Sequence, residues 1–247
     1  MGKPKVSVIT TTYNHPIKMI ERAFSSVRNQ HYKDYEHIFI DDTFTKNGMM
    51  ETYRQALEKC TGKYITFCDG DDCWVDRNRL LKQVSYLDQN KDCGLCLTKV
   101  YTVIDDFWWG MNAPTDVINK NMTYDNLLKG NANIYAQSYM IRKSDFDKYI
   151  DFDKFLKFNV WDYPIVLELI RHTKFHTLDF YSAVYTKNKE SVTNTELRRK
   201  RFKYVMGNYK IKLHYILKYG CELKTFVYLI YKFTRDLLSI GAKRWMK

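Results

Sequence analysis

Residues 63–74 read KYITFCDGDDCW, an apolar, β-prone run that stops at three carboxylates. A buried strand with this ending cannot keep Asp69, Asp71 and Asp72 in its core, because each unpaired carboxylate would cost on the order of several kcal/mol there. We therefore expect them at the C-terminal edge of the strand, which is where ligands bind in open α/β sheets. Clustered carboxylates suit a hard cation such as Mg²⁺ or Mn²⁺, although an acidic turn that binds nothing would use the same residue types.

The chain around this run alternates between strand-like and helix-like patterns. The strand-like runs are 5–12, 35–40, 64–68 and 93–103, and amphipathic helical patterns fill 17–30, 49–60 and 77–90. This order predicts an α/β fold with a mostly parallel, doubly wound, Rossmann-like sheet and right-handed crossovers. Cys93 and Cys96 form a Cys-x-x-Cys pair without a second pair nearby, so we expect buried thiols rather than a zinc or redox site.

A second strand also ends in carboxylates. The run 35–40 is followed directly by Asp41 and Asp42. Because parallel strands end at the same edge of a sheet, both acidic pairs should lie at one site. Two such pairs are harder to explain as turn chemistry than either pair alone.

The pattern after residue 103 is less regular. We expect a loop over 105–116, strands over 134–142 and 175–185, a helix over 160–172, and basic helical structure from Glu196 to the end. Arg77 and Arg79 follow the acidic loop, where they could reach a phosphate or start a solvated helix.

Composition limits the class of protein. The chain has 247 residues with 45% hydrophobic content, which favours a packed globule. It holds no run of about 18 apolar residues and no apolar signal-peptide core, so we expect a cytoplasmic protein without a spanning helix.

The positive charge is concentrated in a C-terminal tail. Residues 198–247 hold 14 Lys and Arg but only 2 Asp and Glu, which accounts for the whole formal net charge of +12. A basic amphipathic pattern ends the chain, with apolar residues at Phe226, Ile230, Phe233, Leu237 and Ile240. Such a helix could lie on an anionic membrane surface, making the protein peripheral there, or pack on the body with a solvated basic face. Nucleic acid is the weakest partner class, because no nucleic-acid motif accompanies the charge.

Several of these segments together resemble family 2 glycosyltransferases of the GT-A fold. The similar segments are the opening strand and Tyr-Asn turn at 5–14, a nucleotide-contacting acidic pair at 39–42, an Asp-x-Asp-Asp motif with its following Trp at 62–74, the strand before the acceptor region at 138–144, and the base-bearing segment at 161–164. The resemblance covers roughly 4–195, and it implies a glycosyltransferase domain at 1–195, with a nucleotide part at about 1–103 and an acceptor part at about 104–195. Residues 196–247 then form the basic helical extension.

The resemblance implies metal-dependent, inverting transfer of a sugar. The donor would be a nucleoside diphosphate sugar, with UDP or dTDP, and the acceptor a glycan or lipid-linked hydroxyl in cell-surface polysaccharide or glycolipid synthesis. Asp71 would be the direct Mn²⁺ or Mg²⁺ ligand, Asp69 would help, and Asp72 would support them. The nucleotide contacts would come from Thr11, Tyr13, Asp41, Asp42 and Asp69.

Two positions leave alternatives open, and a third place in the sequence departs from the family pattern. Tyr13 could stack on the nucleotide or simply pack at the strand end. The resemblance implies that Asp162 is the general base, with Trp161 as an apolar wall that raises its pKa. The residues alone favour an Asp that caps the helix starting at Tyr163-Pro164, and one residue could do both. The family usually continues its second acidic pair with Gly-Ser, where this chain has Thr43-Phe44.

Two other classes share part of this chemistry. A sugar nucleotidyltransferase also binds a nucleotide and a metal, but it usually has a Gly-rich N-terminal phosphate loop, and residues 6–14 contain no glycine. A non-catalytic protein that binds sugar nucleotides or polyanions would not need Asp69, Asp71 and Asp162 together.

Overall fold

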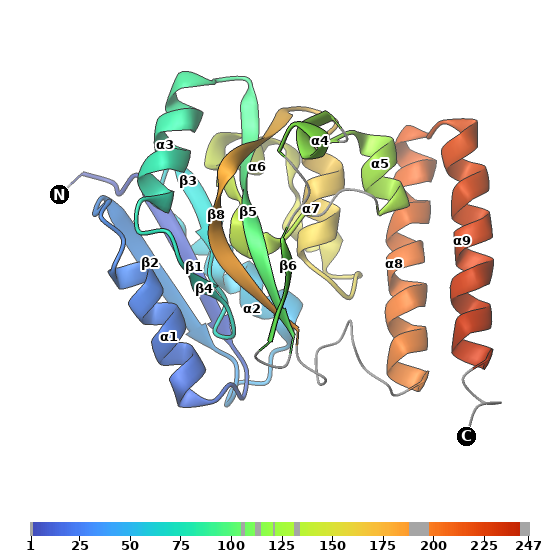
Figure 1. The fold of residues 1–247 in the computed structure, drawn as a ribbon, viewed down its shortest axis with the longest axis horizontal. Coiled ribbons are helices and arrows are strands. Elements are labelled where there is room, and N and C mark those ends of the chain that lie inside the picture. Colours follow the sequence, from blue (N-terminus) through green and yellow to red (C-terminus); the bar gives the residue numbers. More distant parts are fainter. Residues whose placement is uncertain are drawn as a thin grey trace.

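The structure is a computed structural model that describes residues 2–104, 107–111, 115–120, 122–130, 134–187 and 198–242. A central sheet lies among helices, and two long helices stand side by side at one end (Figure 1). The strands are β1 (Val6–Thr12), β2 (Tyr35–Asp41), β3 (Tyr64–Phe67), β4 (Cys73–Trp74), β5 (Cys93–Ile104), β6 (Phe107–Met111), β7 (Met140–Arg142) and β8 (Lys174–Lys187). The α-helices are α1 (Ile17–Arg28), α2 (Met49–Glu58), α3 (Arg79–Gln89), α4 (Thr115–Lys120), α5 (Tyr124–Lys129), α6 (Lys143–Tyr149), α7 (Asp162–Leu169), α8 (Arg198–Tyr219) and α9 (Leu223–Ala242). Short 3₁₀ turns lie at η1 (Ala136–Ser138) and η2 (Phe152–Phe155).

The strands form a sheet in the order β2-β1-β3-β7-β5-β8-β4, with β6 paired to β5. β1 is parallel to both β2 and β3, and β5 is parallel to β8. β7 is antiparallel to β3 and β5, while β4 and β6 are antiparallel to β8 and β5. Within the described part of the chain, β1, β2, β3, β5 and β8 therefore run in one direction. The predicted α/β fold with a mostly parallel sheet is confirmed.

Alternating side chains of the strands reach two separate cores. Val6 and Val8 of β1 pack with α1 and α3, through residues such as Val27 and Leu87. Ile9 faces the other way, toward α2 and α7. Helices thus cover both faces of the sheet, as the doubly wound pattern requires.

Two local predictions are wrong. The run 134–142 is mostly η1 and irregular backbone, and only β7 pairs in the sheet. Residues 107–111, predicted within a loop, form β6, because they fold back on the end of β5 as an antiparallel partner. The described part of the tail is helical, as predicted, and forms two helices that are separated by a turn at Gly220, whose φ of 72° is accessible mainly to glycine. The predicted helix start at Glu196 and the cations Lys243 and Arg244 lie outside the described residues.

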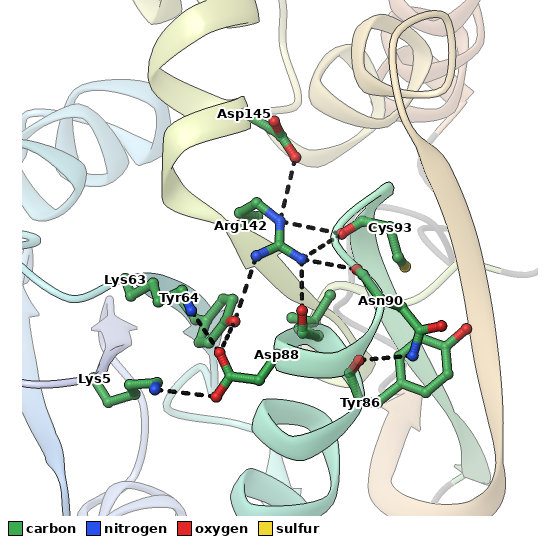
Figure 2. A network of polar contacts seen from close by, with 10 residues as sticks. Lys5, Lys63, Tyr64, Tyr86, Asp88, Asn90, Cys93, Arg142 and Asp145 are labelled. Carbon is green, nitrogen blue, oxygen red and sulfur yellow. Dashed lines mark hydrogen bonds and ion pairs between the residues drawn. The ribbon is translucent and has the colours of Figure 1, made fainter.

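The N-terminal ends of the parallel strands are joined by a polar network (Figure 2). The Arg142 guanidinium at the end of β7 donates to the carbonyl oxygens of Leu87 and Asn90, at 2.7 and 3.0 Å, and to that of Cys93. Asp88 accepts hydrogen bonds from Lys63 and Tyr64. This network fixes the edge of the sheet opposite the one where β1, β2 and β3 end. The cysteines Cys93 and Cys96 are buried free thiols, as predicted.

Helices α8 and α9 pack together and against the body beside α5 and α7 (Figure 1). The Tyr215 hydroxyl donates to the Pro164 carbonyl at 2.9 Å, and the Tyr124 hydroxyl donates to the Tyr215 carbonyl at 2.9 Å. Ile211 and Leu229 are buried in the same core as α7. The boundary after residue 195 stays a prediction.

Candidate functional site

The acidic loop after β3 is bound to the end of β1. The Thr10 hydroxyl donates to the Cys68 carbonyl at 2.7 Å, and the Gly70 N–H donates to the Thr11 carbonyl at 2.9 Å. The Asp72 N–H donates to the Asp69 carbonyl at 2.9 Å, which closes a turn. The loop therefore lies at the C-terminal edge of the sheet, where the sequence predicted it.

Asp69 is held from two elements. Its Oδ2 accepts a hydrogen bond from the Tyr53 hydroxyl of α2 at 2.5 Å, and its Oδ1 accepts one from the Thr11 hydroxyl at 3.0 Å. Burial, with the nearby Asp71 charge, raises the pKa of Asp69 to about 7 despite these bonds. Burial also raises the pKa of Tyr53 well above its ordinary value, so Tyr53 keeps the proton it donates.

Asp71 and Asp72 differ in their surroundings. Asp71 is half-buried, and its backbone carbonyl accepts a hydrogen bond from Arg22 of α1 at 2.7 Å. Asp72 is buried, and burial together with the charges of Asp71 and Asp69 raises its pKa well above the ordinary value. Asp71 is thus the more accessible of the two residues, while Asp72 is buried.

Gly70 is required by close packing. A Cβ at this position would lie 2.8 Å from Nδ1 of His15 and 3.0 Å from Cβ of Thr12. Such contacts are shorter than carbon packing allows. The missing side chain lets the acidic loop approach the end of β1.

The second acidic pair divides into two roles. Asp42 is buried, and its carboxylate accepts hydrogen bonds from the Thr45 hydroxyl at 2.7 Å and the Asn47 and Gly48 N–H groups at 2.7 and 2.9 Å. Burial would raise the pKa of Asp42, but these bonds outweigh it and lower that pKa. Asp42 therefore organises the loop after β2. Asp41, half-buried at the end of β2, accepts a hydrogen bond from the Thr43 N–H with its Oδ1, at 2.9 Å.

Thr43 joins the loops that follow β1 and β2. Its hydroxyl accepts a hydrogen bond from the Asn14 N–H at 3.0 Å. Tyr13, next to Asn14, is 53% exposed, so the alternative that it packs into the strand end is wrong. Its stacking role stays a prediction.

Asp162 opens α7, and the helix begins two residues later than the predicted start at residue 160. Its Oδ1 accepts only the adjacent Tyr163 N–H, at 2.8 Å, whereas a capping side chain bonds two or three residues onward. Trp161 is the residue before the helix and makes no side-chain cap bond. Burial raises the pKa of Asp162. The helix-capping alternative therefore lacks its hydrogen bond.

An aromatic cluster connects Asp162 to the acidic loop. Trp161 is buried and stacks on Tyr53, with ring centroids 4.0 Å apart, and it also contacts Phe67 at 4.4 Å. Tyr139 packs edge-on to Phe67, and its buried hydroxyl has no hydrogen-bond partner among the described residues. Burial and the charges of Asp162 and Asp69 raise the pKa of Tyr139 well above its ordinary value. The charges of both carboxylates therefore act on the Tyr139 hydroxyl.

Sequence reasoning missed several of these contacts. Tyr53 and Arg22 sit within ordinary amphipathic helices, and no local pattern marks them. Arg79 neither reaches a phosphate site nor lies in solvent. It is fully buried, stacks its guanidinium 4.0 Å from the Trp74 ring, and donates to the Thr66 hydroxyl at 3.0 Å.

The donor set fits a divalent cation. Asp69 and Asp71 offer hard carboxylate oxygens, and no Lys or Arg within the described ranges forms an ion pair with either. The described residues contain no cluster of three or more His, Cys, Asp or Glu that could hold a metal ion. A cation bound here would therefore take its other oxygens from a diphosphate and water, as Mg²⁺ commonly does.

Comparison with known proteins identifies the class and then the family. Among solved structures, the chain is similar to S. aureus TarS 1-349 in complex with UDP-GlcNAc, with a TM-score of 0.60 and 16% identity over 94% of this chain and 81% of that one. It is also similar to the mannosyltransferase PcManGT from Pyrobaculum calidifontis in complex with GDP-Man and Mn²⁺, with a TM-score of 0.61 and 15% identity over 98% and 74%. The fold is GT-A.

The family model for glycosyl transferase family 2 matches residues 7–48 and 43–150, which is more than half of the chain. The chain belongs to this family. An uncharacterized glycosyltransferase of Methanocaldococcus jannaschii is 31% identical, over 42% of this chain and 44% of that protein. A GalNAc(5)-diNAcBac-PP-undecaprenol beta-1,3-glucosyltransferase of Campylobacter jejuni is 30% identical, over 28% and 30%. The matched regions span less than half of either relative.

Proposed function

We propose that this protein transfers a sugar from a nucleoside diphosphate sugar to an acceptor hydroxyl, with inversion and with a divalent cation. The observation that carries the proposal is the position of Asp69 and Asp71 at the C-terminal sheet edge, linked through Tyr53 and Trp161 to Asp162. Two relatives by fold are complexes with UDP-GlcNAc and with GDP-Man, which supports a nucleotide sugar as donor. We infer UDP or dTDP as the nucleotide.

The donor would lie along the ends of β1, β2 and β3. Asp41 would accept hydrogen bonds from the base or ribose, and Tyr13 would stack beside it. Asp42 holds the loop that follows Asp41. Asp71 and Asp69 would hold Mn²⁺ or Mg²⁺ against the diphosphate, where the bound cation would neutralise charge on the leaving group.

Asp162 would act as the general base on the acceptor side. A base that removes a proton from a hydroxyl needs a carboxylate near that oxygen and a pKa closer to neutral than that of an exposed Asp. The buried Trp161 wall and the desolvated position of Asp162 supply the second condition. The electron pair of the acceptor oxygen would form the new glycosidic bond as the bond to the diphosphate breaks, which inverts the anomeric carbon.

A panel of nucleotide sugars tests this proposal. Each is incubated with the protein and Mn²⁺, and the released nucleoside diphosphate is measured with and without EDTA. Metal-dependent release from at least one sugar nucleotide is the expected result. Pyrophosphate formation from a nucleoside triphosphate and a sugar phosphate would identify a nucleotidyltransferase instead, and binding without release would favour a non-catalytic protein.

We also propose that α8 and α9 bring the protein to the cytosolic face of an anionic membrane. No helix among the described residues is long and apolar enough to cross a bilayer. Instead, both helices expose apolar side chains. On α8 these include Leu213 and Leu217, and on α9 they are Leu223, Phe226, Val227, Ile230, Tyr231 and Leu238. Basic residues flank them, which suits interfacial binding. This position would give access to a lipid-linked acceptor for surface polysaccharide or glycolipid synthesis.

Liposome flotation tests the membrane proposal. The full chain should float with vesicles that contain anionic lipid, and a double variant, Leu217→Ser with Ile230→Ser, should float less. Both residues are exposed, so the fold should tolerate the changes. Equal flotation of the two proteins would rule the proposal out. So would a full chain that floats equally well with anionic and with neutral vesicles.

A further inference from the structure

A cavity of about 380 Å³ lies between the start of α7 and the helices α8 and α9. Asp162 lines it from α7, Tyr204, Asn208 and Lys212 line it from α8, and Lys232 and Asp236 line it from α9. The cavity therefore joins the candidate base to the basic C-terminal helices.

Lys212 is a buried cation in this cavity. Lys212 is 7% exposed, and no carboxylate in the described part of the chain forms an ion pair with it. Its Nζ lies 5.1 Å from the centroid of the Tyr209 ring. Burial, and then the charge of Lys232, lowers the pKa of Lys212 to about 8, although Asp236 acts in the opposite direction. An unpaired buried ammonium is costly to fold, so this position calls for an explanation.

The other charges of the cavity compensate one another. Asp236 lies 3.6 Å from the Lys232 ammonium and accepts a hydrogen bond from the Tyr209 hydroxyl at 3.1 Å. Among the described residues, Lys212 therefore has no carboxylate of its own in an ion pair, although the charge of Asp236 acts on it, and Asp162 is the carboxylate that lines the cavity from α7. A ligand that reacts at Asp162 and carries a negative charge would satisfy both.

We propose that this cavity binds the acceptor and that Lys212 holds a phosphate or carboxylate of it, so that the protein glycosylates an anionic acceptor. This inference rests on the proposed function, since it takes Asp162 as the base. The aromatic side chains of Tyr204 and Tyr163 offer the flat surfaces on which sugar rings pack.

The experiment compares three small ligands on three proteins. Glucose, glucose 1-phosphate and glucuronate are titrated by NMR into the wild type, Lys212→Met and Lys210→Met, each saturated with UDP and the diamagnetic cation Mg²⁺ so that the donor site is filled. Lys210 is exposed on the same helix and serves as the matched control. In the wild type and in Lys210→Met, an anionic ligand should bind at least about tenfold tighter than glucose, as one charge-assisted contact provides. Lys212→Met should lose this preference, and the preferred anion then distinguishes a phosphate from a carboxylate acceptor.

A second variant keeps the test decisive. Lys212→Arg retains the charge and should retain the preference, even if Lys212→Met folds poorly. A preference for the anion that survives in Lys212→Met, or its absence from the wild type, would overturn the inference. Binding of UDP and Mg²⁺ is recorded separately for every variant, so a failure of the donor site is distinguished from a failure at Lys212.

Discussion

The Tyr53 hydroxyl donates a hydrogen bond to Oδ2 of Asp69 at 2.5 Å, and the Tyr53 ring stacks on Trp161 beside Asp162. One side chain of α2 thus contacts both the acidic loop and the segment that precedes the candidate base. This link explains how a loop after β3 and the start of α7 are held in a fixed relation.

Replacing Tyr53 by Phe should separate these two roles. The ring stacking is retained, while Asp69 loses the donor that orients it. Removal of a group that positions a metal-binding carboxylate typically weakens metal affinity by roughly 10- to 100-fold. We expect that loss in Mn²⁺-dependent UDP binding, measured by calorimetry, with little change in thermal stability. Affinity equal to that of the wild type would show that Asp69 does not depend on Tyr53.

The pH dependence of transfer tests Asp162. Its pKa is raised by burial, and a general base acts only when deprotonated. The rate of transfer should therefore be maximal above the pKa of Asp162 and should fall as the pH drops through that pKa. The fall should occur above 3.8, the ordinary pKa of an Asp side chain. The profile of log(kcat/KM) against pH should show this acidic limb in the wild type. Asp162→Asn should nearly abolish transfer while leaving donor binding intact, and wild-type turnover by that variant would remove Asp162 from the mechanism.

Glu168 provides a test of how α7 is joined to α8. It is 4% exposed, and its carboxylate accepts hydrogen bonds from Lys218 at 2.9 Å and from the Tyr219 hydroxyl. Burial would raise the pKa of Glu168, but these contacts outweigh it, so the pKa is lowered in the folded protein. The stabilisation is then fully present above the unfolded pKa, near 4.5, and is lost as pH falls through the lower folded value.

Glu168→Gln should therefore reduce the free energy of unfolding by about 1–3 kcal/mol at pH 7 and by less at pH 3, as measured by urea denaturation. Lys224→Gln is the matched control. It removes an exposed pair with Glu222 and should cost no more than about 1 kcal/mol. An equal loss at both pH values would contradict the role of the ionised Glu168.

The strands that carry the site were predictable because each has a strong local signal. The β-branched run of β1 and the acidic ends of β2 and β3 place Asp41, Asp69 and Asp71 at one sheet edge from alternation and connection rules alone. The strands that complete the sheet lack such a signal. β7 and β4 are three and two residues long, so periodicity cannot identify them, and their pairing depends on partners distant in sequence.

Side-chain roles within the site were less predictable, because they depend on tertiary contacts. Asp41 and Asp42 are adjacent and of the same residue type, so the sequence does not distinguish them. In the structure, Asp41 accepts the Thr43 N–H, while Asp42 is hydrogen-bonded within the loop that follows it. Arg79 follows a charged loop but is buried under the sheet, where burial lowers its pKa to about 9. Lys212 belongs to a tail with many exposed cations and is distinguished only by the cavity it lines.

The central claim is that Asp71 and Asp69 bind a cation together with a nucleoside diphosphate. Calorimetric titration of UDP and dTDP with Mn²⁺ into the wild type, Asp71→Ala and Asp162→Asn tests it most directly. The wild type and Asp162→Asn should bind a nucleotide equally and only with the metal, while Asp71→Ala should show no metal-dependent binding. A titration of Asp71→Ala that matches the wild type would contradict the claim.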